Sequence, residues 1–186
     1  MPTFQTFEDF LAWERQQDTR PDLVDGVPVA RHPASAAHHA IQDNLFLSAH
    51  RERRGGHFIP FVANLILQTG VRSGRWPDML IIDGEQWRPG VIVAWRPVVV
   101  FEIVSPETQA LDRTIKLGEY DSGTNVAHYV LVEESMPLVH VYSRGQFGGF
   151  IIEPETIRGL DGSFDLPAVG YSLGMAEIYG GLPAER

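Results

Sequence analysis

Three residues in the middle of the chain have the types and surroundings that metal-dependent hydrolysis of phosphodiesters requires. Asp78 follows Pro77 and precedes the apolar run MLII, and Glu102 interrupts the run PVVVFEIV. Lys116 is the only lysine, because the other 14 of the 15 Lys and Arg residues are arginine. Two carboxylates on neighbouring strands suit Mg²⁺ or Mn²⁺, since hard cations prefer oxygen ligands. A nearby lysine could orient an attacking water or stabilise developing charge.

Each of these residues also has a plainer interpretation. Asp78 could be a turn aspartate, because Pro-Asp is a common dipeptide. Lys116 could be a surface residue paired with Asp112 one helical turn earlier. Glu102 could be exposed near the end of its strand, but strand alternation places it on the same face as Val100 and Val104. Because burying a charge is costly unless it is paired or bound to a metal, the sequence favours a functional role for Glu102.

The region around these residues resembles the Uma family of restriction-endonuclease-like proteins, within the PD-(D/E)XK nuclease superfamily. That family shows a valine-rich strand ending in Glu-x-x-Ser-Pro, an Asp-x-x-x-Lys helix, then Tyr, Gly and a strand similar to YWLVD. Upstream elements similar to LIDG and P…H..I are also present, and the resemblance covers roughly residues 20–175. The matching positions are Pro77, Asp78, Glu102, Ser105, Pro106, Asp112, Lys116, Tyr120, Gly123 and Glu133, with Leu23 to Gly26, Pro33, His38 and Ile41 upstream.

The resemblance implies a site and a chemistry. Asp78, Glu102 and Lys116 are the expected catalytic residues, and Asp78, Glu102 and the backbone carbonyl of Ile103 are the expected ligands of Mg²⁺ or Mn²⁺. In the superfamily at large the lysine lies two residues after the glutamate; Val104 occupies that position here, so the lysine must come from the following helix. Asp22 replaces the glutamate that usually precedes LIDG, and Glu133 replaces the aspartate after YWLV.

Three further residues are candidate accessory groups: His38, Asp22 and Asp112. His38 has Ile41 and Leu45 at i+3 and i+7, so it could face the sheet and contact a phosphate or a bound water, or it could be a packed or exposed histidine. A zinc site built from His32, His38 and His39 is disfavoured, because their spacing lacks the i, i+4 pairing of zinc motifs.

Charge limits how the chain could meet nucleic acid. The net charge of −9 argues against broad nonspecific DNA binding. Residues 1–100 carry 10 Arg and 11 acids, whereas residues 101–186 carry 4 Arg, one Lys and 13 acids. A phosphate-contacting face is therefore expected in the first half, unless these arginines simply belong to a solvated helix end and loop. The candidate contacts are Arg51, Arg53, Arg54, Arg72 and Arg75.

The pattern of apolar residues predicts an α/β fold of the restriction-endonuclease-like class, with a central mixed β-sheet flanked by helices. The expected helices are an amphipathic one over 5–17, a second one ending at Gly55-Gly56, a third from about Thr108 to Tyr120 and a short final one. A hairpin is expected at Asp25-Gly26. The expected strands are FIPFVANLILQ as one run, PDMLIID, PVVVFEIV, VAHYVLVE, LVHVYSR and FGGFIIE.

These features predict one domain over residues 1–186 with a metal-dependent endonuclease activity on DNA. The alternative is a catalytically silent binding or regulatory module that keeps the same fold, since fold does not fix function. No stretch is long and apolar enough to span a membrane, and the absence of cysteine fits a reducing cytoplasm. A homodimer is expected by analogy with nucleases that cut both strands.

Overall fold

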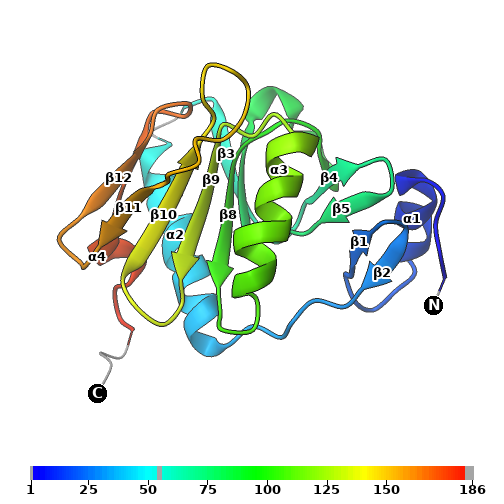
Figure 1. Cartoon of the computed structure of the whole chain (residues 1–186), viewed down its shortest axis with the longest axis horizontal. Helices are drawn as coiled ribbons and strands as arrows, with labels where there is room; N and C mark the ends of the chain where they lie inside the picture. Colours follow the sequence, from blue (N-terminus) through cyan, green and yellow to red (C-terminus); the bar gives the residue numbers. More distant parts are fainter. Residues whose placement is uncertain (1, 54–55, 183–186) are drawn as a thin grey trace.

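The computed structural model describes residues 2–53 and 56–182. At its centre is a mixed six-stranded sheet, in which β8 and β9 are parallel and the other neighbours are antiparallel (Figure 1). In spatial order the strands are β11 (Glu155–Arg158), β10 (Leu138–Ser143), β9 (His128–Glu133), β8 (Pro97–Val104), β6 (Met79–Asp83) and β3 (Phe58–Val62).

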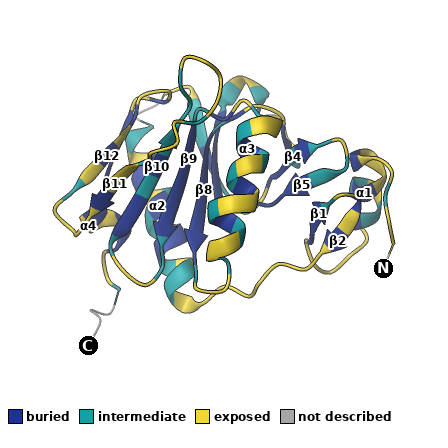
Figure 2. Cartoon of the chain, in the orientation of Figure 1, coloured by how far each residue is buried: buried dark blue, intermediate teal, exposed yellow. Residues whose placement is uncertain are grey.

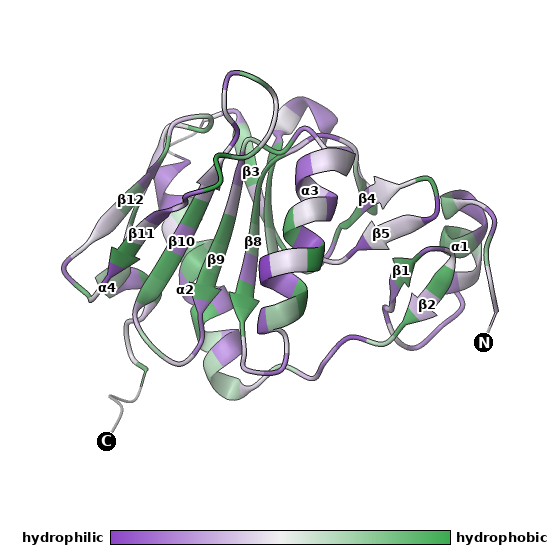
Figure 3. Cartoon of the chain, in the orientation of Figure 1, coloured by the Kyte–Doolittle hydropathy of each residue, from purple (hydrophilic) through white to green (hydrophobic). Residues whose placement is uncertain are grey.

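Strand β8 is central because its residues are apolar on both faces, as its position between β6 and β9 requires. Val99, Phe101 and Ile103 belong to one buried cluster, whereas Val100 and Val104 belong to a second one on the opposite face. Figure 2 shows β8 and β9 buried along most of their length, and Figure 3 shows apolar residues concentrated in the same strands. The predicted alternation in this strand is confirmed.

Helices cover both faces of this sheet. Helix α2 (Ala36–Glu52) lies on the face of Val99 and Phe101, and Ser35 caps it by accepting from the His38 N–H at 3.0 Å. A π-helical segment, η2 (Leu111–Lys116), continues into α3 (Leu117–Gly123) on the other face (Figure 1). The predicted central mixed sheet flanked by helices is confirmed.

A second, five-stranded sheet adjoins the face that carries α3. Its hairpin of β1 and β2 turns at Asp25 and Gly26, which have φ of 47° and 83°, as the sequence predicted. Helix α1 (Phe7–Glu14), shorter than the predicted 5–17, packs Phe7 and Phe10 against this sheet. In spatial order the strands are β2 (Val27–Val29), β1 (Asp22–Val24), β5 (Ser73–Arg75), β4 (Ile66–Gly70) and β7 (Val93–Ala94).

The C-terminal part packs onto the α2 face of the main sheet. The hairpin of β12 (Ser163–Leu166) and β13 (Tyr171–Gly174) leads into the short helix α4 (Met175–Ile178), which contacts α2. The final helix was predicted, but the hairpin was not. A short 3₁₀ helix, η1 (Gly84–Gln86), follows β6. Across residues 2–53 and 56–182, no helix combines the length and apolar character needed to cross a membrane.

Four further predicted elements differ from the structure in part. The run FIPFVANLILQ is two strands in different sheets, because Ala63 adopts φ of 39° and breaks it. The segment FGGFIIE contributes only an isolated bridge between Phe150 and Arg144, and the edge strand is β11 instead. The third helix begins near the predicted Thr108, since Gln109 and Ala110 are already helical, but it extends through Gly123 rather than ending at Tyr120. Helix α2 ends at Glu52 rather than at Gly55-Gly56.

Candidate active site

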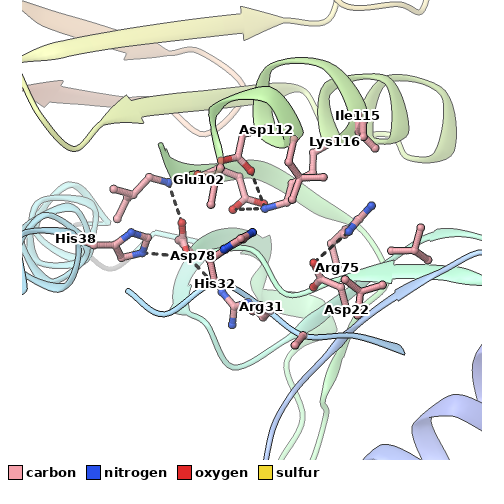
Figure 4. Close-up of a pocket in the computed structure, with 16 residues that line it drawn as sticks. Asp22, Arg31, His32, His38, Arg75, Asp78, Glu102, Asp112, Ile115 and Lys116 are labelled. Atoms are coloured by element: carbon pink, nitrogen blue, oxygen red, sulfur yellow. Dashed lines mark hydrogen bonds and ion pairs between the residues drawn. The ribbon is translucent and has the colours of Figure 1, made fainter. Parts of the chain in front are cut away.

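A cavity of about 290 Å³ opens where the main sheet, the N-terminus of α2, segment η2 and the β1–β2 hairpin meet (Figure 4). Asp78, Glu102 and Lys116, the three predicted catalytic residues, all line it. Strand register explains the meeting, because Met79 pairs with Phe101 and thus sets Asp78 beside the Glu102–Ile103 peptide. The structure therefore brings together residues that lie up to 38 positions apart in the sequence.

Asp78 is buried, and its carboxylate has three partners. Its Oδ2 accepts from the Ile103 N–H at 2.8 Å, and its Oδ1 lies 3.2 Å from His38 Nε2 and 3.3 Å from Arg31 Nη2. The backbone carbonyl of Asp78 accepts from Gln42 Nε2 at 2.8 Å. The alternative of a turn aspartate does not hold, because the carboxylate faces the cavity and is tied to two other elements.

Glu102 is 2% exposed, so it is not a solvent-facing residue at the strand end. Its Oε1 accepts from the Tyr120 hydroxyl at 2.8 Å, and its Oε2 lies 2.9 Å from Lys116 Nζ. Tyr120 is itself fully buried on α3. The glutamate is thus held from the helix on both of its oxygens.

Lys116 is buried and bridges two carboxylates. Its Nζ lies 2.9 Å from Glu102 and 2.8 Å from Asp112 Oδ1 (Figure 4). The plainer interpretation was right about the pairing with Asp112 but wrong about a surface location, because Lys116 is buried. Both residues lie in the π-helical segment, a rare backbone form that is frequent at functional sites. The Tyr129 hydroxyl donates to the Asp112 carbonyl at 3.0 Å and fixes this segment on β9.

The site contains three buried carboxylates and one buried lysine, and their burial and mutual interactions shift several pKa values. Burial raises the pKa of Glu102 to about 8, against the attraction of Lys116 and with help from Asp78 and Asp112. Burial also acts to raise the pKa of Asp78, but His38, Lys116 and the Ile103 N–H outweigh it and hold that pKa below its usual range. Burial acts to lower the pKa of Lys116, and the surrounding carboxylates reverse this and raise it. Lys116 therefore stays charged among its acidic neighbours.

The oxygen donors of the site fit a divalent cation. Asp112 Oδ1 is buried, makes no hydrogen bond within the described part of the chain, and meets Lys116 only as an ion pair. Glu102 Oε2 likewise has only Lys116 as its recorded partner among the described residues. Carboxylate oxygens with spare lone pairs are the ligands Mg²⁺ and Mn²⁺ prefer. The chemistry of these oxygens suits a hard cation, although the ligand atoms of Asp78, Glu102 and Asp112 do not all lie within 4.8 Å of one another in the described residues.

The remaining predicted residues have distinct positions. Asp22 accepts from Arg75 Nη1 at 3.1 Å and from the Trp76 N–H at 3.0 Å, so its carboxylate is committed to structure although it lines the cavity. Arg75 was expected to contact nucleic acid, and the structure contradicts this: it is 2% exposed and bound to Asp22 and Glu119. The residue type alone could not reveal that Arg75 is buried where β5 meets α3.

The other candidate arginines lie outside the cavity. Arg72 donates to the carbonyls of Phe4 and Asp25, which commits much of its guanidinium to the backbone. Arg51 is well exposed, and Arg53 donates to the carbonyl of Gly56. Arg54 lies outside the described residues. Nucleic-acid contact by Arg51 and Arg53 stays a prediction.

Two contributors to the site were not assigned a role from the sequence. Arg31 reaches Asp78 from the loop between β2 and α2, where no periodicity or motif marks it. Tyr120 was identified only as a position of the family pattern. Its hydrogen bond to Glu102 gives a physical reason for a tyrosine at that position. The Ile103 amide donates to Asp78, and metal ligation by the Ile103 carbonyl stays a prediction.

Comparison with known proteins identifies the family of this chain. The family model of Uma2, described as "putative restriction endonuclease", matches residues 7–174. The chain belongs to the Uma2 family. An uncharacterized protein of Synechocystis sp. is 25% identical over 176 residues, covering 94% of this chain and 91% of that protein.

The fold matches that of a solved structure. A crystal structure from Anabaena variabilis, described as a "putative nuclease belonging to DUF820", superposes with a TM-score of 0.73 at 18% identity. The match covers 94% of this Uma2 chain and 97% of the other. At this identity the likeness shows the fold alone, and the restriction-endonuclease-like class predicted from the sequence is confirmed.

Proposed function

We propose that this Uma2 chain is a metal-dependent endonuclease that hydrolyses DNA phosphodiester bonds. The observation that carries the proposal is the buried set of Asp78, Glu102, Asp112 and Lys116 around one cavity. Stability alone would not select this arrangement, because burying three carboxylates around one lysine is costly. Perturbed ionisable groups in a cleft are a recognised signature of a functional site.

The protein's own residues divide the work. Asp78, Glu102 and Asp112 would hold Mg²⁺ or Mn²⁺, which when bound supplies charge neutralisation and an acidified water for attack on phosphorus. Lys116 stays protonated and is placed to stabilise the negative charge that develops on the phosphate oxygens. His38 and the Ile103 N–H fix the orientation of Asp78 through opposite oxygens. Tyr120 does the same for Glu102.

The same proposal covers the setting of the enzyme. DNA is the expected substrate, with the exposed Arg51 and the neighbouring Arg53 as candidate phosphate contacts outside the cavity. We expect a cytoplasmic homodimer that presents two such cavities to the two strands, since the net charge of −9 makes binding over the whole surface unfavourable. One domain over residues 1–186 stays part of this expectation.

A cleavage assay with matched variants tests the proposal. Supercoiled plasmid is incubated with the wild type in Mg²⁺, in Mn²⁺ and in EDTA, and with Glu102→Gln and Glu155→Gln in each cation. Glu155 is an exposed glutamate on the edge strand β11, so its substitution controls for the chemical change itself. We expect cleavage only with a divalent cation, lost by at least about 100-fold in Glu102→Gln and kept in Glu155→Gln.

Calorimetric titration of Mn²⁺ on the same samples separates the alternatives. Cation binding without cleavage of any duplex or single-stranded DNA would favour the silent binding module. Absence of both binding and cleavage in a folded wild type would refute the enzyme. Equal cleavage by wild type and Glu102→Gln would show that the nuclease activity comes from elsewhere.

A further inference from the structure

Most positive groups around the cavity are already engaged and shielded from solvent. The side chain of Lys116 is 10% exposed and that of His38 is 12% exposed, and each contacts a carboxylate of the site. Arg75 is 2% exposed and held by two carboxylates. Arg31 differs, because its side chain is 32% exposed at the cavity mouth.

Arg31 is also engaged through only a small part of its donor capacity. A guanidinium carries five N–H donors in a planar fork. Within the described residues, its one recorded side-chain partner is Asp78 Oδ1, at 3.3 Å from Nη2. The free donors lie at the opening of the cavity, where they can meet an incoming anion.

Asp78 Oδ1 is the crowded oxygen of the site. It faces both Arg31 at 3.3 Å and His38 at 3.2 Å, and a carboxylate oxygen has about two lone-pair positions. A cation that takes this oxygen must displace one of the two partners. His38 is fixed in the first turn of α2 and little exposed, whereas Arg31 lies in a loop and is partly solvated. Arg31 is therefore the partner that can leave.

We infer that Arg31 is a phosphate-binding residue held in reserve by Asp78. In the cation-free protein, Asp78 holds the guanidinium over the cavity. When a divalent cation neutralises Asp78, Arg31 turns its fork to the backbone phosphate of a nucleic acid, a geometry that guanidinium matches in bidentate fashion. The inference rests on the proposed function, because it names how that site would bind its substrate.

The position of Arg31 between two hollows supports this role. It lines the site cavity and also a neighbouring cavity of about 480 Å³, whose wall includes Trp13, Pro21 and Pro28. A phosphate bound at Arg31 would have its flanking nucleotides in open space on both sides. Lys116 and His38 do not line the second cavity, so neither of these described residues lies between the two cavities as Arg31 does.

DNA binding measured against salt tests the inference without relying on turnover. A short fluorescent duplex is titrated with wild type, Arg31→Ala, Arg31→Lys and Arg88→Ala, in Ca²⁺ and in EDTA, at several salt concentrations. Arg88→Ala is the control, because it removes the same charge. Arg88 is exposed beyond the far end of β6, and its side chain donates to the carbonyls of Glu85 and Trp87. Thermal melts of each variant report folding, and Mn²⁺ titration reports the cation site.

We expect Arg31→Ala to weaken DNA binding in Ca²⁺ by about tenfold or more. Its plot of log affinity against log salt should become shallower by about 0.9, the value of one lost phosphate contact on a duplex. In EDTA the loss should be much smaller, because Asp78 then retains Arg31. Arg31→Lys should restore the salt slope but not the full affinity, and Arg88→Ala should match the wild type. Mn²⁺ should bind Arg31→Ala at least as tightly as the wild type.

Several results would overturn the inference while leaving the nuclease intact. Equal losses in Ca²⁺ and EDTA, or an unchanged salt slope, would make Arg31 a fixed brace of Asp78. Weaker Mn²⁺ binding by Arg31→Ala would show that Arg31 supports the cation site rather than competing for it. A wild type that binds DNA and shows the Arg31 pattern, yet cuts nothing, would uphold the inference and refute the nuclease. A wild type that binds cation but no DNA would overturn the inference.

Discussion

Two buried charge clusters lie next to each other along the helix of η2 and α3, and each contains one aspartate, one glutamate and one base. The first, called the arginine cluster, is Asp22, Arg75 and Glu119. The second, called the lysine cluster, is Asp112, Lys116 and Glu102. Lys116 and Glu119 are one turn apart on the same helix, so the two clusters share a support but differ in the base.

The arginine cluster is closed by directional hydrogen bonds. Arg75 donates from Nε at 2.7 Å and from Nη2 at 2.6 Å to the two oxygens of Glu119, and Nη1 serves Asp22 at 3.1 Å. Burial acts to lower the pKa of Arg75, and Glu119 and Asp22 outweigh it and raise that pKa. The fork matches carboxylate geometry, so the cluster satisfies itself.

The lysine cluster is not closed in this way. An ammonium is a compact point charge, and here it meets Glu102 and Asp112 as ion pairs, while the third carboxylate, Asp78, stands close enough to raise the pKa of Glu102. The comparison teaches that burial and charge alone do not mark a site. The site is the cluster that has a third carboxylate beside it, Asp78, and that keeps a buried carboxylate oxygen, Asp112 Oδ1, without a hydrogen bond among the described residues.

The largest expected effects come from replacing the positively charged residue of each cluster by methionine. Arg75→Met should lower the free energy of unfolding by about 3–5 kcal/mol, because the buried Asp22 and the half-buried Glu119 lose their partner. Added Mg²⁺ should not restore it, since Asp22 and Glu119 are arranged for a guanidinium. Urea unfolding measures both effects, with Arg51→Met as the control; that side chain is 66% exposed and should change stability by less than about 0.5 kcal/mol.

Lys116→Met should have a smaller effect in EDTA, on the order of 2 kcal/mol, because Glu102 can take up a proton and relieve the uncompensated charge. Mg²⁺ or Mn²⁺ should recover most of this loss, since the cation replaces the missing positive charge among Glu102, Asp112 and Asp78. Unfolding curves with and without cation give the answer. Equal rescue, or equal lack of rescue, in the Arg75 and Lys116 variants would erase the distinction between the clusters.

A pH series sharpens the same contrast through Glu102. Its pKa is about 8 in the folded protein against an ordinary value of 4.5. Between these values the unfolded chain loses the proton and the folded protein keeps it, so stability is greatest below pH 4.5 and falls as pH rises towards 8. In EDTA, the wild type should lose up to about 1.4 kcal/mol per pH unit in this window relative to Glu102→Gln.

Cation should oppose this pH dependence, because it favours the ionised carboxylate. The measurement is urea unfolding of both proteins from pH 5 to pH 8.5, in EDTA and in Mg²⁺. A stability difference that stays flat with pH in EDTA would mean that Glu102 is ionised throughout and that Lys116 alone balances it.

The lysine cluster could be predicted from the sequence because its members carry strong local signals. Glu102 interrupts an apolar strand, Lys116 is unique in the chain, and the family pattern links them to Asp78. The arginine cluster could not be predicted, because Arg75 looks like any surface arginine until β5 is placed against α3. The same limit applies to Arg31, whose loop has no periodicity and whose role depends on tertiary contacts alone.

The elements of the fold also differ in how well the sequence predicts them, and again the strength of the local pattern decides. Strand β8 and helix α2 were predicted because their apolar patterns extend over eight and 17 residues. The break at Ala63 was missed because the residues on both sides are apolar and a single residue with positive φ separates two sheets. The hairpin of β12 and β13 was missed because its strands are only four residues each, too short for periodicity to distinguish them from a loop.

The smallest expected effects come from removing, in each cluster, the hydroxyl group that donates to the glutamate. Thr69 donates to Glu119 at 3.4 Å in the arginine cluster, and Tyr120 donates to Glu102 at 2.8 Å in the lysine cluster. Thr69→Val should cost no more than about 1 kcal/mol of stability and leave Mn²⁺ affinity unchanged, because the bond is long and Arg75 holds Glu119 independently.

Tyr120→Phe should act on the cation instead. Glu102 then loses the donor that orients it, so Mn²⁺ should bind about 10-fold more weakly, the lower end of the range for a group that supports a ligand. Calorimetry on the two variants gives the comparison directly. If Thr69→Val weakened Mn²⁺ binding as much as Tyr120→Phe did, the two clusters would form one coupled network. A change at Glu119 would then reach the cation site through the shared helix.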